Sequence, residues 1–188
     1  MTRLLARAWP VLLAAVGGNA VVQALLVAPF VTPGGSVPFL ALALASFCAI
    51  VGSLGVVVGR LRSLVSGAGR AWTVWAACLA VVLAVGLAAL ASSWLVPVTL
   101  TVVLILLAGT TIGRGTAGFA TFRHHPVRAI LLAVVTLLVI GLLWLGALLL
   151  GFFITGLPAA LLTWLAFGVV GVLLLTAWTS LASRSLSL

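Results

Sequence analysis

The sequence predicts an all-α integral membrane protein with six transmembrane helices, arranged as three helical hairpins with both termini in the cytoplasm. Two observations predict the membrane class. The chain is 65% hydrophobic and only 5% charged, whereas about 25% of the residues in a soluble domain are charged. It also contains several apolar windows of the roughly 17–25 residues that a bilayer-spanning helix needs. A third observation, the placement of the basic residues, predicts the orientation. Residues 1–188 then form a single polytopic membrane domain.

Six apolar windows are long enough to span a bilayer. They cover residues 8–30, 38–59, 71–94, 96–113, 127–150 and 158–182. A competing interpretation treats residues 1–24 as a cleaved signal peptide, with a basic start, an apolar middle and "VQA" as the cleavage site. The apolar run continues beyond that site, which favours a first helix that stays in the membrane.

Every basic residue falls in an alternate gap between the windows. All nine are arginine, and the chain has no Asp, Glu, Lys or Tyr. The arginines are Arg3 and Arg7 before the first window, Arg60, Arg62 and Arg70 after the second, Arg114, Arg123 and Arg128 after the fourth, and Arg184 after the sixth. Because cytoplasmic loops carry the excess of basic residues, this pattern predicts that all of them face the cytoplasm.

These arginines have no acidic side chain to pair with. Apart from the terminal carboxylate of Leu188, nothing in the chain can form a salt bridge with them. Each guanidinium must therefore meet water, lipid phosphate, a backbone carbonyl or another protein. The expected partners are the lipid bilayer, its anionic lipids and an acidic cytoplasmic or membrane protein, whereas no nucleic acid is expected.

Two arginine-bearing loops predict short interfacial helices. In "GRGTAGFATFRHHPVR", Phe119 and Phe122 share one helix face, and in "RLRSLVSGAGR" Leu61, Leu64 and Val65 do the same. The loops either set the topology alone or dock a phosphate or an acidic partner. The candidate lipid- or partner-binding residues are Arg60, Arg62, Arg70, Arg114, Arg123, His124, His125 and Arg128.

The first window contains a polar notch, "GGNAVVQ". Asn19 and Gln23 are four residues apart, so they share a helix face about 6 Å apart along the axis. Amides in hydrocarbon need partners, which predicts an interhelical hydrogen bond aided by close approach at the two glycines. The alternative is a ligand site. Candidate partners or fellow ligand-binding residues are Thr99, Thr101 and Thr163.

Other side chains predict how the helices face one another and the membrane. The small residues of the second window, including Gly52 and Gly59, predict a helix contact. An aromatic belt is expected at the membrane boundaries. Its members are Trp9, Trp72, Trp75 and Trp178 on the inner side and Trp94 on the outer side.

The chain holds few residues suited to catalysis or metal binding. General acid–base chemistry usually uses carboxylates, His, Lys or Tyr, and only the adjacent His124 and His125 are present. Cys48 and Cys78 lie in apolar runs without metal-ligand spacing, so both are expected in the core. We expect no enzyme activity, no metal and no cofactor.

An internal repeat supports the three hairpins. "RAW" at 7–9 returns at 70–72 and weakly as "RAI" at 128–130, and Pro38, Pro97 and Pro158 begin the second, fourth and sixth windows. This pattern resembles the six-helix membrane domains that are fused to some bacterial glycerophosphodiester phosphodiesterases, and their stand-alone relatives. The resemblance implies a bacterial cell membrane, and it carries over no functional residue. Length and span count are also similar to substrate-binding subunits of energy-coupling-factor vitamin transporters.

Three functional hypotheses follow, in order of preference. The first is a non-catalytic membrane subunit or scaffold whose arginine loops hold anionic lipid or an acidic partner. The second is a transporter subunit with a small-solute site near Asn19 and Gln23. The third is an enzyme that acts on lipid headgroups through His124 and His125.

Overall fold

The structure is a computed structural model and describes residues 2–29, 34–67 and 70–185. These residues form seven helices and no strand, which confirms the all-α prediction. The helices are α1 (Thr2–Val27), α2 (Val37–Val65), α3 (Ala71–Ala91), α4 (Leu95–Thr111), α5 (Ala117–His124), α6 (Pro126–Phe153) and α7 (Leu157–Ser185).

The six predicted windows fall on the six longer helices. Among the described residues, α1, α2, α3, α6 and α7 are long and apolar enough to cross a membrane, and α4 is a shorter apolar helix of 17 residues. The outer faces are apolar as well as the core. Leu87, Leu90, Leu138 and Leu142 are all more than 60% exposed. An apolar exterior of this extent suits a lipid environment.

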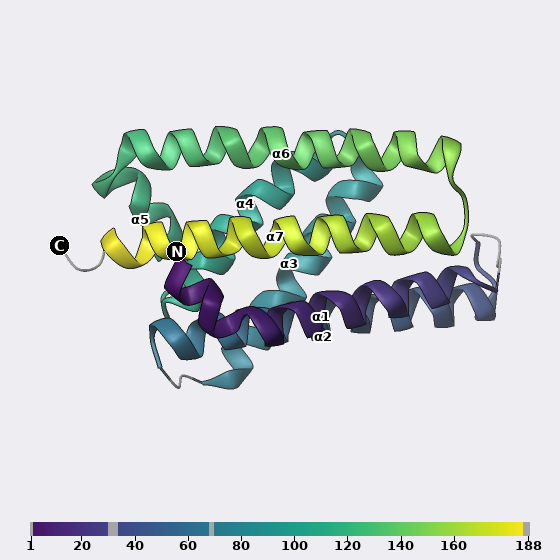
Figure 1. Ribbon diagram of the computed structural model, residues 1–188, viewed down its shortest axis with the longest axis horizontal. Helices are drawn as coiled ribbons and strands as arrows, with labels where there is room; N and C mark the ends of the chain where they lie inside the picture. The colour runs from purple at the N-terminus through teal and green to yellow at the C-terminus, as the bar shows by residue number, and fades with distance from the viewer. Residues whose placement is uncertain (1, 30–33, 68–69, 186–188) are drawn as a thin grey trace.

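Two helices occupy the centre of the bundle. Among the described residues, α4 packs against α2, α3, α5, α6 and α7, and α7 packs against every helix except α3. The helices α1, α2, α6 and α7 run along the long axis of the molecule, whereas α3 and α4 cross obliquely behind them (Figure 1). Each predicted hairpin forms a packed pair, namely α1 with α2, α3 with α4 and α6 with α7.

Proline marks the helix starts as predicted. Pro38, Pro97 and Pro158 lie in the first turns of α2, α4 and α7, where a missing N–H leaves no bond unmade. The structure adds Pro10, which lies inside α1, and α1 bends near its N-terminal end (Figure 1). Proline inside a helix removes one backbone hydrogen bond and favours such a bend.

The helices approach closely at glycines other than the predicted ones. A Cβ added to Gly17, Gly18, Gly52 or Gly59 would meet nothing within 4 Å, so the predicted contacts at these positions are wrong. The close contacts lie elsewhere. Gly55 of α2 lies against the Trp75 ring of α3, and Gly168 of α7 lies against Val16 of α1. Hydropathy patterns do not distinguish a glycine that faces lipid from one that faces a helix.

Two side chains lie in environments that differ from the predicted ones. Trp178 is fully buried and its Nε1–H donates to Thr136 Oγ1 at 3.0 Å, so it belongs to the core and not to the aromatic belt. Its indole finds a polar partner inside the bundle, which removes the reason to lie at the membrane boundary. Cys78 is buried as expected, whereas Cys48 is exposed on α2. Trp72 and Trp94 are exposed, consistent with a belt.

Candidate functional site

The arginine-bearing segments meet at one end of the bundle. An Arg60 Nη2 hydrogen bond to the Arg7 carbonyl at 3.2 Å joins α2 to α1. Ser66 Oγ donates to the Thr111 carbonyl at 2.9 Å, next to the end of α4, and Thr111 and Thr179 share a 3.0 Å hydroxyl contact between α4 and α7.

The start of α1, the end of α7 and the whole of α5 lie together at this end (Figure 1). We call it the basic end. Its described side chains are Arg7, Arg60, Arg62, Arg70, Arg114, Arg123, His124, His125, Arg128 and Arg184, and the side chain of Arg3 lies outside the described part.

The loop after the second window is a continuation of α2. The helix runs to Val65, with Ser66 as its C-cap, so the predicted interfacial helix over "RLRSLVSGAGR" is wrong. Leu61 is fully buried, Leu64 packs on the core and Val65 packs near Ala182. These apolar side chains find protein neighbours, and so the helix stays in the bundle instead of lying on the membrane surface.

The second loop forms a helix, α5, which is docked on the bundle. Gly113 adopts a positive φ of 83°, and the Arg114 N–H donates to the Gly109 carbonyl at 3.0 Å. This is the Schellman geometry that ends a helix and reverses the chain. The reversal lays α5 against α4 so closely that a Cβ on Gly118 would overlap the Ile105 carbonyl.

Of the two phenylalanines of α5, one packs against the bundle and the other is exposed. Phe122 packs on Trp178, with ring centroids 6.0 Å apart, whereas Phe119 is 42% exposed. The prediction that both rings enter the headgroup zone is therefore wrong for Phe122. The face pressed onto the bundle consists of Ala117, Gly118 and Thr121, all buried, and their small size permits the close approach.

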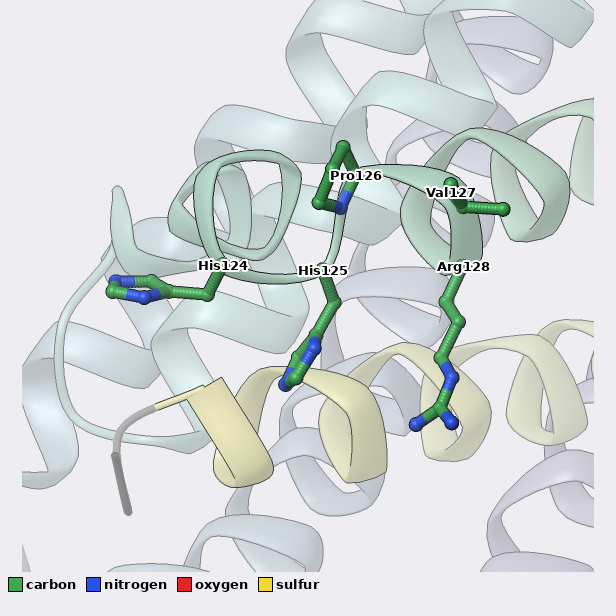
Figure 2. A pocket seen from close by; sticks show the side chains of 5 residues that line it. All are labelled: His124, His125, Pro126, Val127 and Arg128. Atoms are coloured by element: carbon green, nitrogen blue, oxygen red, sulfur yellow. The ribbon is translucent and has the colours of Figure 1, made fainter.

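The two histidines line a shallow cavity between α5 and α6. It has a volume of about 320 Å³ and is lined by His124, His125, Pro126, Val127 and Arg128. Figure 2 shows that the His125 and Arg128 side chains extend in the same direction, whereas the His124 ring points away from both. The adjacent histidines therefore do not converge on one point.

A second cavity lies between α2 and α3. It has a volume of about 290 Å³, and its lining includes Arg60, Arg62 and Ser63 of α2 and Ala71 and Trp75 of α3. We call it the α2–α3 groove. Its arginines are conspicuous in the sequence, whereas the α3 residues that line it are not, because the local sequence does not reveal which helices are neighbours.

Arg60 and Arg62, the two arginines of the groove, each make one hydrogen bond and each leave one donor without a partner. Besides the Arg60 bond to the Arg7 carbonyl, Arg62 Nη1 donates to Thr73 Oγ1 at 2.7 Å. The Nε–H of each guanidinium is buried and has no hydrogen-bond partner. A buried donor without a partner costs about 1–3 kcal/mol, so an acceptor brought to this place gains free energy.

The remaining basic residues are more open to the surroundings. Arg70 is exposed and forms the N-cap of α3, which has no side-chain capping bond. Arg114, Arg123 and Arg128 are also exposed. The structure thus divides the predicted set into surface arginines and the two half-buried groove arginines.

The polar notch is a contact between α1 and α2. Gln23 is buried, its Nε2–H donates to the Ser46 carbonyl at 3.1 Å, and Ser46 Oγ donates to Gln23 Oε1 at 2.7 Å. A longer bond of 3.4 Å joins Gln23 Nε2 to Asn19 Oδ1. The predicted interhelical hydrogen bond is confirmed, and its partner is Ser46.

The predicted threonine partners are wrong. Among the described residues, α1 makes no contact with α4, which carries Thr99 and Thr101. Thr101 is buried and donates to the Pro97 carbonyl of its own helix at 2.9 Å. Thr163 lies on α7, and none of the hydrogen bonds of Gln23 in the described part reaches it. Threonine commonly satisfies its hydroxyl within its own helix, which removes the need for a distant amide.

Comparisons with protein-family models, with curated proteins and with solved structures find no match to this chain.

Proposed function

We propose that the chain is a non-catalytic, six-span protein of a bacterial cell membrane whose basic end faces the cytoplasm and binds anionic lipid. Two observations support this function: the exterior of the helices is apolar, and the arginines gather at one end of the bundle. Arginine near a membrane surface attracts anionic headgroups by roughly 1 kcal/mol per residue. The protein then acts as a scaffold or subunit anchored to an anionic lipid surface.

The sixth span in this proposal is α4. Its 17 residues extend for about 25 Å, somewhat less than the hydrocarbon thickness of about 30 Å. Contacts with five other helices surround it, and protein-buried backbone is tolerated at membrane depth. If α4 crosses, α5, the start of α1 and the end of α7 share one membrane face, in agreement with their common position in Figure 1.

The observation that carries the proposal is the unmet hydrogen-bonding capacity of the groove arginines. The Nε–H groups of Arg60 and Arg62 are buried without a partner, and no Asp or Glu exists in the chain to supply one. Guanidinium groups pair best with planar or tetrahedral oxyanions. Phospholipid phosphate is the oxyanion most abundant at a membrane surface.

The two alternative functions receive less support. The Gln23 amide is occupied by Ser46 and Asn19, which favours a helix contact over a solute site. The His124 ring points away from His125 and Arg128 (Figure 2), so the two histidines do not act on one point.

The test is lipid selectivity of the purified protein in mild detergent. Native mass spectrometry with equal amounts of phosphatidylglycerol and phosphatidylcholine should show preferential binding of phosphatidylglycerol. Added salt should weaken the binding of phosphatidylglycerol to the exposed arginines. Equal binding of both lipids, with no anionic lipid carried through purification, would contradict the proposal. Co-purification of an acidic protein without lipid preference would instead identify a protein partner.

A further inference from the structure

We propose that the α2–α3 groove is a specific site for one anionic phospholipid, with its phosphate on Arg60 and Arg62 and its first acyl carbons along Val56 and Trp75. This inference rests on the proposed function, because it assumes that the basic end meets anionic lipid. It goes further by assigning that lipid to one place on the molecule.

The polar half of the groove contains two arginines that favour a phosphate. Arg60 and Arg62 both line the cavity, and the Nε–H of each is buried without a hydrogen-bond partner. Ser63 also lines the cavity, although its hydroxyl already donates to the Arg60 carbonyl at 2.8 Å. Bidentate pairing of a guanidinium with phosphate uses two parallel N–H groups, and each of these arginines keeps an unpartnered Nε–H that can take part in such a pair.

The start of α3 adds a further donor set. Ala71, its first residue, lines the groove, and α3 has neither a side-chain cap nor an acidic residue in its first turn. The N–H groups and the positive end of the dipole at a helix N-terminus favour an anion. This feature supports the site because it lies beside the two unpartnered guanidinium donors.

The apolar half explains why the ligand is a lipid. Val56 and Trp75 line the groove and are 44% and 45% exposed, so the groove opens onto the apolar outer surface of the bundle. The Trp75 ring also lies against Gly55, so one part of it contacts α2 and the rest is open to the surroundings. A soluble phosphate has no use for this surface, whereas an acyl chain gains from covering it.

The size of the groove agrees with this ligand. Its volume of about 290 Å³ is near the lower limit of small-molecule sites, about 300 Å³. It accommodates a headgroup and the first carbons, and the remaining chain lies on the outer surface. Gly59 lines the groove, and a Cβ there would meet nothing within 4 Å, so a larger side chain at this position starts in open space and occupies part of the groove.

The test compares two glycine variants of α2. Gly59→Leu fills the groove without changing charge, and Gly52→Leu is its control, since Gly52 lies two turns away on nearly the same helix face and is equally open. Both replace helical glycine with a better helix former. Native mass spectrometry with phosphatidylglycerol should show at least a tenfold loss of the tightest binding event in Gly59→Leu and less than a twofold change in Gly52→Leu.

A second variant tests the phosphate contact separately. Arg60→Lys with Arg62→Lys keeps the net charge and removes the guanidinium forks, and should also lose at least tenfold in the tightest event. Inorganic phosphate in a hundredfold excess over lipid should leave that event in place. Displacement by inorganic phosphate would show that the ligand is a soluble anion and overturn the lipid assignment.

The failures of the two proposals are distinguishable. Wild-type preference for phosphatidylglycerol that persists unchanged in Gly59→Leu and in the lysine variant overturns the groove and leaves the proposed function standing. A wild type without any such preference overturns both. Size-exclusion chromatography and thermal unfolding of each variant establish that a loss of binding is not a loss of fold.

Discussion

The contact between Gln23 and Ser46 shows how a single polar side chain is accommodated among apolar helices. The two residues exchange hydrogen bonds at 3.1 and 2.7 Å, so the amide is satisfied without water. Interhelical bonds of this kind in membranes contribute about 0.6 kcal/mol on average, with a maximum of roughly 1.7 kcal/mol. The contribution is small because a lone serine can turn to a carbonyl of its own helix.

A double-mutant cycle measures this contribution. Gln23→Leu and Ser46→Ala should show a coupling of about 0.6 kcal/mol in the free energy of unfolding in detergent, because both remove the bond from Ser46 Oγ to Gln23 Oε1. The bond from Gln23 Nε2 to the Ser46 backbone carbonyl survives Ser46→Ala, so it does not enter the coupling. Ser53→Ala is the control, since the Ser53 hydroxyl donates to the Ile50 carbonyl of its own helix. Coupling of Gln23 to Ser53, or none to Ser46, would show that this contact is misassigned.

The groove arginines, unlike Gln23, are only partly hydrogen-bonded within the chain. Arg60 and Arg62 pair through their Nη atoms with a carbonyl and a hydroxyl of neighbouring helices, and each keeps one buried Nε–H unpaired. In a chain with acidic residues such donors would be expected to meet a carboxylate. Here no Asp or Glu side chain exists to supply that acceptor, which is the physical basis of both proposals.

Among the helices, α5 shows how a loop becomes part of the bundle. The left-handed Gly113 turns the chain back, and the small buried face of α5 then packs against α4, with Phe122 on Trp178. The arginines and histidines of this segment are thereby fixed relative to the helices. A helix free to roll on the membrane surface would leave their spacing undefined.

Close approach of α5 to α4 depends on Gly118. Gly118→Ala places a methyl group onto the Ile105 carbonyl, so α5 must shift and the protein should lose about 1–3 kcal/mol of stability. A lower midpoint of thermal unfolding in detergent is the expected result. Gly115→Ala serves as the control, because a Cβ at Gly115 meets nothing within 4 Å. An unchanged midpoint in Gly118→Ala would contradict the packing of α5.

Sequence periodicity predicted the helices better than it predicted their contacts. Pro38, Pro97 and Pro158 and the apolar windows located the long helices to within a few residues, because helix formation in a membrane depends on local hydropathy and backbone satisfaction. The partner of Gln23 and the glycines at helix contacts were not predictable. These depend on which helices are neighbours, and a uniformly apolar helix has no polar face that reports its orientation.

The candidate site was also predicted only in part, because the sequence does not show which helices are neighbours. Arg60 and Arg62 were selected because charge in an apolar chain is conspicuous. Thr73 and Trp75, which complete the surroundings of these arginines, have no local signal that distinguishes them from other residues of α3. Only the packing of α3 beside α2 reveals them.

At the scale of the whole molecule, charge is distributed along one axis. The hydrogen bonds of Arg60, Ser66 and Thr111 join α1, α2, α4 and α7 at the basic end. The opposite turns, near Ser36, Ser93 and Thr155, contain no ionisable side chain. This asymmetry predicts one orientation in the membrane, and every function proposed for the basic end depends on it.

Labelling of single cysteines with a membrane-impermeant maleimide tests that orientation most directly. In a background of Cys48→Ala and Cys78→Ala, a cysteine in place of Ser36, Ser93 or Thr155 should react in intact cells. Gly115→Cys should react only after the membrane is permeabilised, because in the proposed topology α4 returns the chain to the cytoplasmic face. Reaction of Gly115→Cys and Ser93→Cys from the same side would show that α4 does not cross, and would contradict the single basic face.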